Sequence, residues 1–198
     1  MAVCVPSRPP RASVRPLSLV PKAVPPARPV NEEARLAALH SLDILDTAAD
    51  RRFDRLTALA ADLFQVSAAL VSLVDENRQW FKSTCNLDAK ETSRDISFCG
   101  HAILEEKLLV IDDALLDPRF SRNPLVLGAP HIRFYAGAVL RNASMQPLGT
   151  LCIIDQAPRT FRRVDRRRLL ALAELVEQEI DHHYDVIQLR KLMERLGC

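Results

Sequence analysis

Two pairs of apolar, strand-length runs constrain this chain more than any other feature of its sequence. Residues 68–75 are almost continuously apolar, and a short turn containing Asn77 leads into a second run, 79–84. Residues 132–140 and 150–155 form the other pair, and a polar turn joins them. Short polar turns between such runs are typical of antiparallel hairpins. We therefore predict an antiparallel sheet, with 68–75 as a central strand because it lacks polar alternation.

Helices are expected before and after these strands. Residues 32–42 follow a good N-cap, Asn31, and residues 49–64 carry one apolar stripe. A long helix is predicted from about residue 163 to 196 by apolar residues at helical spacing. Short helices are predicted to begin near residues 99 and 117, with a short strand at 108–111 and irregular chain at 85–95 and 124–130. The fold class is α+β: an antiparallel sheet with the N- and C-terminal helices on one face and short helices and loops over the other.

The two ends of the chain differ from its middle. Residues 1–30 hold eight of the thirteen prolines and five basic residues without an acidic one, which predicts a disordered tail. A transit peptide shares this charge, but its amphipathic helix is incompatible with so many prolines. We expect one folded domain at 31–182. Residues 183–198 extend the last helix with apolar residues three and four apart, the pattern of a coiled coil.

Composition excludes several classes of protein. Residues 31–198 hold 22 basic and 25 acidic residues, which argues against nucleic acid as a partner. No apolar run reaches the roughly 18–20 residues of a transmembrane helix, so no membrane association is expected. The five cysteines are irregularly spaced and form no Cys-x-x-Cys motif. This pattern favours reduced thiols in a cytoplasmic protein.

The stretch from Arg94 to Ile103 concentrates the most chemistry in the fewest residues. Polar groups alternate there with apolar ones, as they do in a ligand pocket and also in an ordinary helix N-terminus packed on a sheet. Arg133 and Tyr135 alternate with Phe134, so both are expected on one face of a strand, as donors to an anionic or polar ligand or simply on a solvated face. The candidate ligand-binding residues are Arg94, Asp95, Ser97, Phe98, Cys99, His101, Arg133 and Tyr135.

Cys99 and His101 invite a catalytic or metal-binding interpretation. A thiol beside a helix N-terminus has a lowered pKa and is prone to oxidation, although a small buried residue packing on the sheet fits the same position. On a helix, side chains two residues apart point about 200° away from each other, whereas on a strand they share a face. Because we predict a helix here, we expect neither a shared metal nor a nucleophile–base pair, and we assign no catalytic residue.

Five segments in order then resemble one known family. They are ALVSLVDENRQWFKS, RDISFCGHAIL, LLVIDDALLDPRFSRNPLV, HIRFYAGAVL and LGTLCIIDQAPRTF. Together, over residues 32–182, they resemble a GAF domain of the bacterial signalling subgroup often joined to diguanylate cyclases and histidine kinases. The resemblance implies a ligand cavity between one face of the sheet and a set of short helices and loops, surrounded by residues 98–103, 117–130 and the strand 132–140. It also implies dimerisation through the first and last helices.

The resemblance narrows the ligand only by exclusion. Members of the family bind cyclic nucleotides, bilins, haem or small metabolites. The Asn-Lys-x-Phe-Asp pattern of the cyclic-nucleotide binders is absent, and Gly100 separates Cys99 from His101 where bilin binders have an adjacent Cys-His pair. One branch of the family reduces free methionine sulfoxide with several cysteines. Cys99 resembles one of these, but no counterpart of the others occurs near residue 89 or within 117–130.

The sequence therefore predicts a non-enzymatic sensory domain in signal transduction. We expect it to bind a small molecule, to form a homodimer through its terminal helices and to relay a signal through them to a separate output protein. The residues identify neither the ligand nor a cofactor. The alternatives are a dimerisation or scaffold domain with a filled cavity and, from another class, a thiol-based free methionine sulfoxide reductase.

Overall fold

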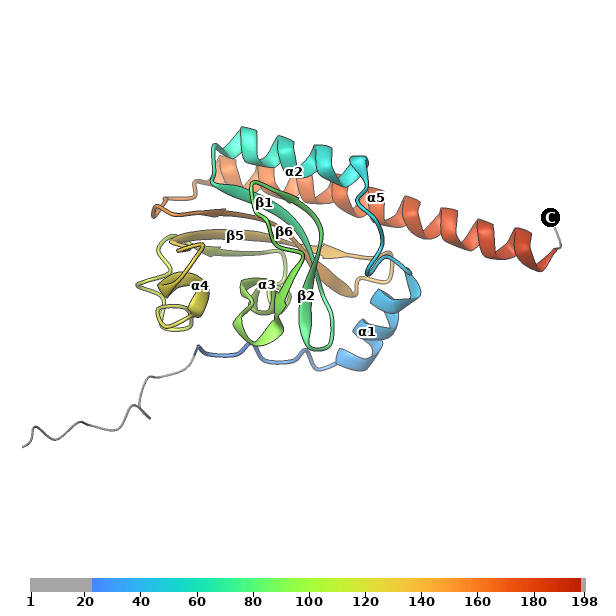
Figure 1. Ribbon diagram of the computed structural model, residues 1–198, viewed down its shortest axis with the longest axis horizontal. Coiled ribbons are helices and arrows are strands. Elements are labelled where there is room, and N and C mark those ends of the chain that lie inside the picture. Colours follow the sequence, from blue (N-terminus) through green and yellow to red (C-terminus); the bar gives the residue numbers. More distant parts are fainter. Residues whose placement is uncertain (1–22, 197–198) are drawn as a thin grey trace, which may run out of the picture.

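The predicted antiparallel sheet is the centre of the computed structural model, which describes residues 23–196 (Figure 1). Its six strands lie in the order β3-β2-β1-β6-β5-β4, and all neighbouring strands are antiparallel. The strand predicted to be central, β1, lies between β2 and β6 and is buried along its whole length. The strands are β1 (Ala68–Val74), β2 (Arg78–Cys85), β3 (Glu91–Ser93), β4 (Leu108–Ile111), β5 (Phe134–Arg141) and β6 (Pro147–Asp155).

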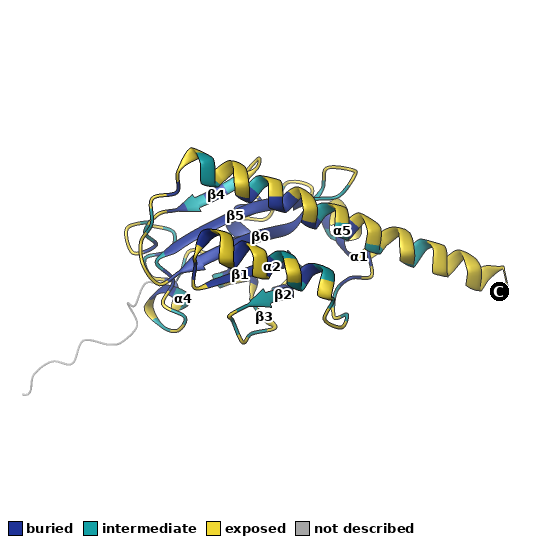
Figure 2. Ribbon diagram, turned by 90° about the horizontal axis from the view of Figure 1, so that it is seen from above, coloured by how far each residue is buried: buried dark blue, intermediate teal, exposed yellow. Residues whose placement is uncertain are grey.

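Helices cover both faces of the sheet, as the α+β prediction requires. Helices α2 (Arg51–Phe64) and α5 (Arg163–Arg195) lie side by side over one face (Figures 1 and 2). Helix α1 (Glu32–Ser41) lies at an end of the sheet and contacts β6. The other face is covered by a 3-10 turn at Arg94–Ile96, by α3 (Phe98–Ala102) and by α4 (Pro124–Leu127).

Each face of the sheet has its own apolar core, because successive side chains of a strand point to opposite faces. On β5, Phe134 and Ala136 belong to the core under α2 and α5, whereas Tyr135 belongs to the core under α3. On β6, Ile153 and Cys152 divide in the same way. Figure 2 shows the strands buried beneath the exposed outer surfaces of α2 and α5. The two cores therefore share strands, and a shift of β5 or β6 affects both.

Helix α2 shows how the sequence fixes an element on the first of these cores. Asp50 is its N-cap, and its carboxylate accepts a hydrogen bond from the Arg52 backbone N–H at 3.0 Å. Phe53, Ala60 and Phe64 recur at helical spacing and are buried against the sheet. The side-chain hydrogen bond from Arg52 lowers the pKa of Asp50 from 3.8 to about 2.

Replacing Asp50 with alanine is expected to lower the free energy of unfolding by about 1 kcal/mol, because it removes the acceptor of an otherwise unpaired helix N–H. Urea denaturation measures the change. Asp62→Ala is the matched control, since Asp62 is exposed near the other end of the same helix, where a carboxylate is unfavourable to the helix dipole. Equal losses in the two variants would argue against the capping role.

Several elements differ from those predicted. The segment opened by Asp117 and Pro118 forms turns instead of a helix, and the Asp117 carboxylate accepts from the backbone and side chain of Arg119 within them. Helix α4 forms instead in the stretch expected to be loop, where Asn123 Oδ1 accepts from the Leu125 N–H at 2.9 Å. Strand β3, within the stretch predicted to be irregular, pairs with the start of β2.

The two ends of the chain lie outside the described residues. Residues 1–22, most of the predicted tail, and residues 197–198, the end of the predicted helical extension, are not described. Residues 23–30 have no helix or strand and run along the domain, where His101 Nε2 donates to the Val24 carbonyl at 3.0 Å. Beyond Ile180, helix α5 extends past the sheet with exposed apolar residues that include Val186, Leu189 and Met193.

Candidate functional site

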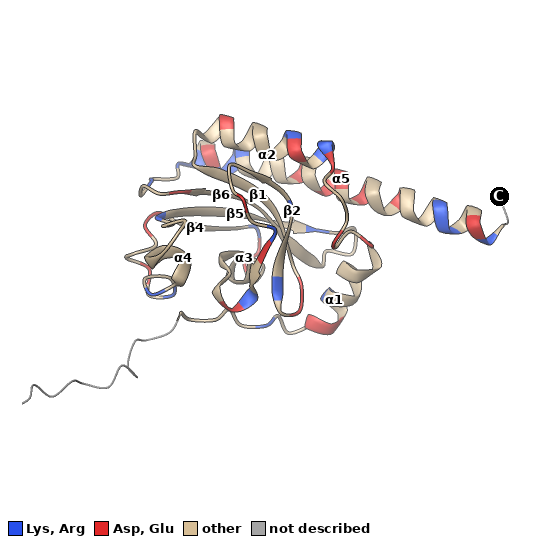
Figure 3. Ribbon diagram, viewed as in Figure 1, with Lys and Arg blue, Asp and Glu red and all other residues tan. Residues whose placement is uncertain are grey.

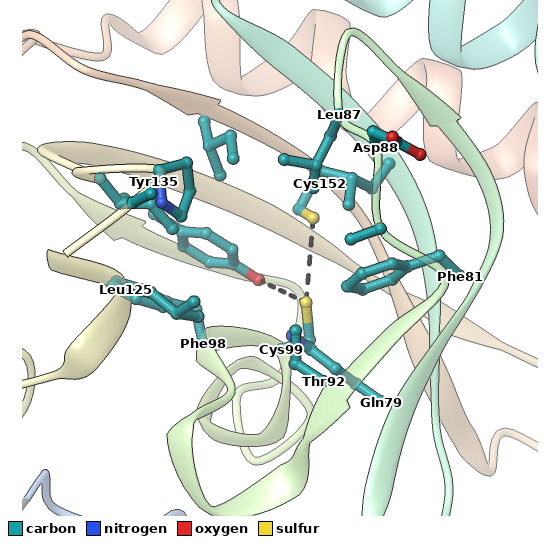
Figure 4. Close-up of a pocket in the computed structure, with 16 residues that line it drawn as sticks. Gln79, Phe81, Leu87, Asp88, Thr92, Phe98, Cys99, Leu125, Tyr135 and Cys152 are labelled. Atoms are coloured by element: carbon teal, nitrogen blue, oxygen red, sulfur yellow. Dashed lines mark hydrogen bonds between the residues drawn. The ribbon is translucent and has the colours of Figure 1, made fainter.

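A cavity of about 300 Å³ lies between the sheet and the α3–α4 cover (Figure 4). Strands β1, β2, β5 and β6 all contribute side chains to it, and the rest come from α3, from α4 and its following turn, and from residues 87–92. Most of the lining is apolar, and the apolar residues are Leu70, Phe81, Leu87, Ala89, Phe98, Leu125, Ala129, Pro130, Ile132 and Ile154. An apolar pocket with a few polar groups is the usual form of a small-molecule site.

Strands β1, β5 and β6 bring almost no charge to this cavity. Strand β1 has no charged residue, β5 has only Arg141 at its end, and β6 has only Asp155 at its end. Figure 3 shows the charged residues mainly on the helices and the connecting segments. Among the described residues that line the cavity, the one charged side chain is Asp88, which is exposed. Since no arginine, lysine or histidine is among them, the cavity has no evident site for an anion.

Gln79 on β2 lines the cavity and has an unpaired polar atom in its side chain. Its Nε2 donates to Thr92 Oγ1 at 2.6 Å, which ties β2 to β3. Its Oε1 is buried and has no hydrogen-bond partner within the described part of the chain. Leaving a buried acceptor unpaired costs about 1–3 kcal/mol. A molecule with a hydrogen-bond donor would satisfy this atom.

Aromatic side chains form one wall. The Phe98 and Phe120 rings stack with centroids 4.0 Å apart, and the Tyr135 ring lies 5.1 Å from that of Phe98. The Tyr135 hydroxyl donates to Cys99 Sγ at 3.6 Å (Figure 4). Burial raises the pKa of Tyr135 above its usual range, so its hydroxyl stays protonated and remains a donor.

Two thiols meet beside this wall. Cys99 Sγ on α3 and Cys152 Sγ on β6 are 3.8 Å apart (Figure 4). The contact with the Cys152 thiol, together with the nearby hydroxyls of Ser72, Thr150 and Tyr135, lowers the pKa of Cys99 against the effect of burial. The same contact and burial raise the pKa of Cys152. Within the pair, the ionised form is therefore favoured at Cys99 and the protonated form at Cys152.

Three of the eight residues singled out in the sequence line the cavity: Phe98, Cys99 and Tyr135. Ser97 lies just outside and caps α3, because its hydroxyl accepts from the Gly100 N–H at 2.9 Å. His101 points away from Cys99, as expected for a helix. It contacts Val24 and packs edge-on against Phe120.

The three charged candidates do not reach the cavity, contrary to the sequence-based expectation. Asp95 is exposed at the 3-10 turn, and Arg94 is buried in an ion pair with Glu32 instead of pairing with Asp95. Strand β5 begins at Phe134, so Arg133 lies just before it. The Arg133 Nη1 donates to the carbonyls of Val126 and Ile132. The expectation that Arg133 and Tyr135 act together as ligand donors therefore has no geometric support.

Sequence reasoning missed Gln79, Thr92 and Cys152. A signal existed for Gln79, since it lies two residues from Phe81 on β2, and side chains two apart on a strand share a face. Gln79 could therefore have been predicted from the sequence as a polar residue that shares a face of the strand with Phe81. Cys152 lies 53 residues from Cys99, and no local pattern indicates that the fold brings the two together.

With this geometry established, comparisons identify the family. The family model described as GAF domain matches residues 48–180, and the chain belongs to the GAF domain family. A cyclic di-GMP phosphodiesterase from Pseudomonas aeruginosa is 46% identical over 134 residues. This match covers 68% of the chain and only 23% of that relative. The chain therefore carries a domain of the sensory and signalling type and corresponds to a minor part of the relative.

Solved structures agree with this fold. The GAF domain of an Acinetobacter phosphoenolpyruvate-protein phosphotransferase has a TM-score of 0.58 at 17% identity, covering 78% of this chain and 98% of that one. A free methionine-R-sulfoxide reductase from Neisseria meningitidis, solved with its substrate, has a TM-score of 0.57 at 15% identity, covering 83% and 98%. At these identities the likeness establishes the fold alone.

Two further classes of site are absent from residues 23–196. None of the helices described there is both long and apolar enough to cross a membrane. Over the same residues, no group of three or more histidine, cysteine or acidic side chains converges in a way that could hold a metal ion.

Proposed function

We propose that this chain is a non-enzymatic sensory domain that binds a small, largely apolar molecule carrying a hydrogen-bond donor. The observation that carries the proposal is the buried, unpaired Oε1 of Gln79, a residue that lines this largely apolar cavity. A ligand donor at this atom would recover the free energy that an unpaired buried acceptor costs. The apolar remainder of the ligand would pack against residues such as Phe81, Phe98 and Leu125.

Charge and size define the ligand further. The exposed Asp88 at the cavity is compatible with a neutral or cationic molecule and unfavourable for an anion. A volume of about 300 Å³ is at the lower end of the range for small-molecule sites. A cyclic dinucleotide carries two phosphates, for which this lining offers no basic partner. We therefore do not extend the substrate of the Pseudomonas relative to this cavity.

The signal is proposed to leave through the helices on the opposite face. Cys152 and Tyr135 face the cavity, and their neighbours Ile153 and Phe134 pack in the core beneath α5. A ligand that moves β5 or β6 would therefore move the packing of α5. The exposed apolar residues beyond Ile180 fit a homodimer formed through the terminal helices, with the output in a separate cytoplasmic protein.

Two alternatives predict different measurements. A scaffold domain needs no cavity, and the open volume beside an unpaired Gln79 favours binding over that function. A thiol-based free methionine sulfoxide reductase draws support from the contact between Cys99 and Cys152. Thioredoxin-coupled reduction by wild type and Cys99→Ser distinguishes it, because equal or absent activity in both excludes the enzyme.

The proposal is tested by native mass spectrometry of freshly purified protein, with Gln79→Leu as the variant. We expect wild type to carry a small molecule and the variant to bind it roughly tenfold or more weakly, since a hydrogen bond worth about 1–3 kcal/mol is lost. Gln178→Leu is the matched control, because Gln178 is exposed on α5.

Two results would contradict the proposal. One is undiminished occupancy in Gln79→Leu. The other is an empty wild-type protein whose melting temperature no member of a neutral and cationic metabolite library raises.

A further inference from the structure

The cavity contains a pair of thiols that the proposed binding function does not use. Cys99 and Cys152 come from different elements, α3 and β6, and their sulfurs are in contact at 3.8 Å. Both side chains are almost closed to bulk solvent, yet both line the cavity. A small molecule in the cavity therefore lies beside both cysteines.

The surroundings of Cys99 favour its ionised form. Ser72 on β1 and Thr150 on β6 are directly paired across the sheet, and both are fully buried. Within the described residues, neither hydroxyl has a partner at hydrogen-bonding distance, so both are free to donate to the Cys99 sulfur as it ionises. With the Tyr135 hydroxyl at 3.6 Å, these groups lower the pKa of Cys99. The thiolate is the nucleophilic form of cysteine.

We propose that Cys99 and Cys152 form a peroxide-oxidation site that closes to an intramolecular disulfide inside the cavity. The disulfide itself needs no ligand, whereas its effect on ligand binding rests on the proposed function. Cys99 is the attacking thiol in this scheme and Cys152, which keeps its proton, is the resolving thiol.

The reaction balances with hydrogen peroxide as the oxidant. The Cys99 thiolate attacks one peroxide oxygen, the O–O bond breaks, and the leaving hydroxide takes the proton that Cys99 released to form water. Cys99 is now a sulfenic acid. The Cys152 sulfur attacks the sulfenic sulfur, an S–S bond forms, and the S–O bond breaks. The departing hydroxide takes the Cys152 proton and forms a second water. A cellular dithiol restores both thiols by exchange.

Oxidation would change the shape and polarity of the cavity. A disulfide holds its sulfurs about 2 Å apart, so α3 and β6 must approach each other at this point. The Tyr135 hydroxyl would lose its present acceptor, the Cys99 sulfur, which leaves a buried donor free to face a ligand. The oxidised and reduced domains would therefore bind different molecules, or the same molecule with different affinity.

Peptide mapping of the full-length wild-type chain tests the oxidation. The reduced protein is exposed to hydrogen peroxide, denatured, alkylated and digested. We expect a peptide pair linking Cys99 to Cys152 that disappears after treatment with dithiothreitol. Cys85 serves as an internal reference, because it lies on β2, is partly exposed and does not line the cavity.

Variants then separate the attacking role of Cys99 from the resolving role of Cys152. Cys85→Ala should form the same linked pair, Cys99→Ala should form none, and Cys152→Ala should retain a sulfenic acid at Cys99 that dimedone captures. Recovery of Cys99 and Cys152 as free thiols at a peroxide concentration that oxidises Cys85 would overturn the proposal. So would a Cys99 disulfide with any other cysteine in wild type. Since these results come from wild type, they hold even if a variant fails to fold.

The same samples separate this inference from the proposed function. Native mass spectrometry before and after oxidation should show that the occupancy of the co-purified molecule changes when the disulfide forms. A disulfide in a protein that never carries a ligand would remove the sensory proposal and leave the oxidation site. A bound ligand in a protein that forms no disulfide would remove the oxidation site and leave the sensory proposal.

Discussion

Replacing Glu32 with glutamine is expected to destabilise the domain by about 3 kcal/mol, although Glu32 is far in the sequence from the residues that line the cavity. Removing one member of a buried ion pair leaves an uncompensated charge, which costs about 3–5 kcal/mol. We place the effect at the lower end because the Glu32 side chain keeps 13% of its exposure.

The size of this effect comes from the number of charges that Glu32 serves. Its Oε2 accepts from Arg35 Nε at 2.8 Å, and its Oε1 accepts from Arg35 Nη2 at 2.9 Å and from Arg94 Nη1 at 2.5 Å. Both guanidinium groups are buried. Arg35 also donates to the Val74 carbonyl, and Arg94 to the Asp75 carbonyl. One carboxylate therefore joins α1 to the end of β1 and to the 3-10 turn before α3.

The pH dependence follows from the same contacts. Burial acts to raise the pKa of Glu32, but hydrogen bonds from Arg35 and Arg94 prevail and lower it from 4.5 to about 2. Because the folded pKa is the lower one, the contribution of Glu32 to stability is fully present above pH 4.5 and is lost as the pH falls toward about 2. The difference between wild type and Glu32→Gln should therefore narrow over that interval.

Urea denaturation at a series of pH values measures both effects. Glu33→Gln is the control, since Glu33 is the exposed neighbour on the same helix, and its midpoint should stay close to that of wild type. A Glu32→Gln loss no larger than that of Glu33→Gln would refute the buried network. A difference that stays constant down to pH 2 would refute the lowered pKa.

The sheet and its helices were predictable because each is encoded locally. The continuous apolar run in 68–74 has one physical solution, a strand buried on both faces, and the stripe on 51–64 follows from helical spacing. The elements that sequence reasoning misplaced are short ones. Asn123 and Asp117 each accept from the backbone N–H two residues on, yet Asn123 begins a helix and Asp117 begins turns, so neither periodicity nor the capping residue distinguishes the two.

Only one wall of the candidate site could be predicted from the sequence. The stretch 94–103 does supply one wall, through Phe98 and Cys99. Its charged residues were misassigned because a charge in a polar–apolar pattern fits a pocket rim and a structural ion pair equally well. Only the fold shows that Arg94 meets Glu32, 62 residues away. The contact between Cys99 and Cys152 is long-range in the same sense.

A glycine in the centre of the sheet allows the close strand packing on which the candidate site is built. Gly149 on β6 lies opposite Leu73 on β1, next to the point where the pairing of β1 with β2 shifts register. A Cβ added at Gly149 would lie 1.9 Å from the Ser72 carbonyl oxygen and 2.8 Å from Leu73 Cα. These are backbone atoms, so no side-chain rotation relieves the clash. The two strands approach so closely here that only glycine fits.

Gly149→Ala is therefore expected to lower the free energy of unfolding by about 3 kcal/mol or more, beyond the usual cost of overpacking because the backbone itself must move. Urea denaturation measures the loss. Gly128→Ala is the control, since its added Cβ meets a single atom at 3.1 Å, the Pro124 carbonyl oxygen, and its midpoint should fall by much less. An unchanged midpoint in Gly149→Ala would contradict the close packing of β1 and β6.

The same substitution should also slow the reaction of Cys99 with peroxide, provided that the variant folds. The displaced strand, β1, carries Ser72, whose hydroxyl favours the Cys99 thiolate.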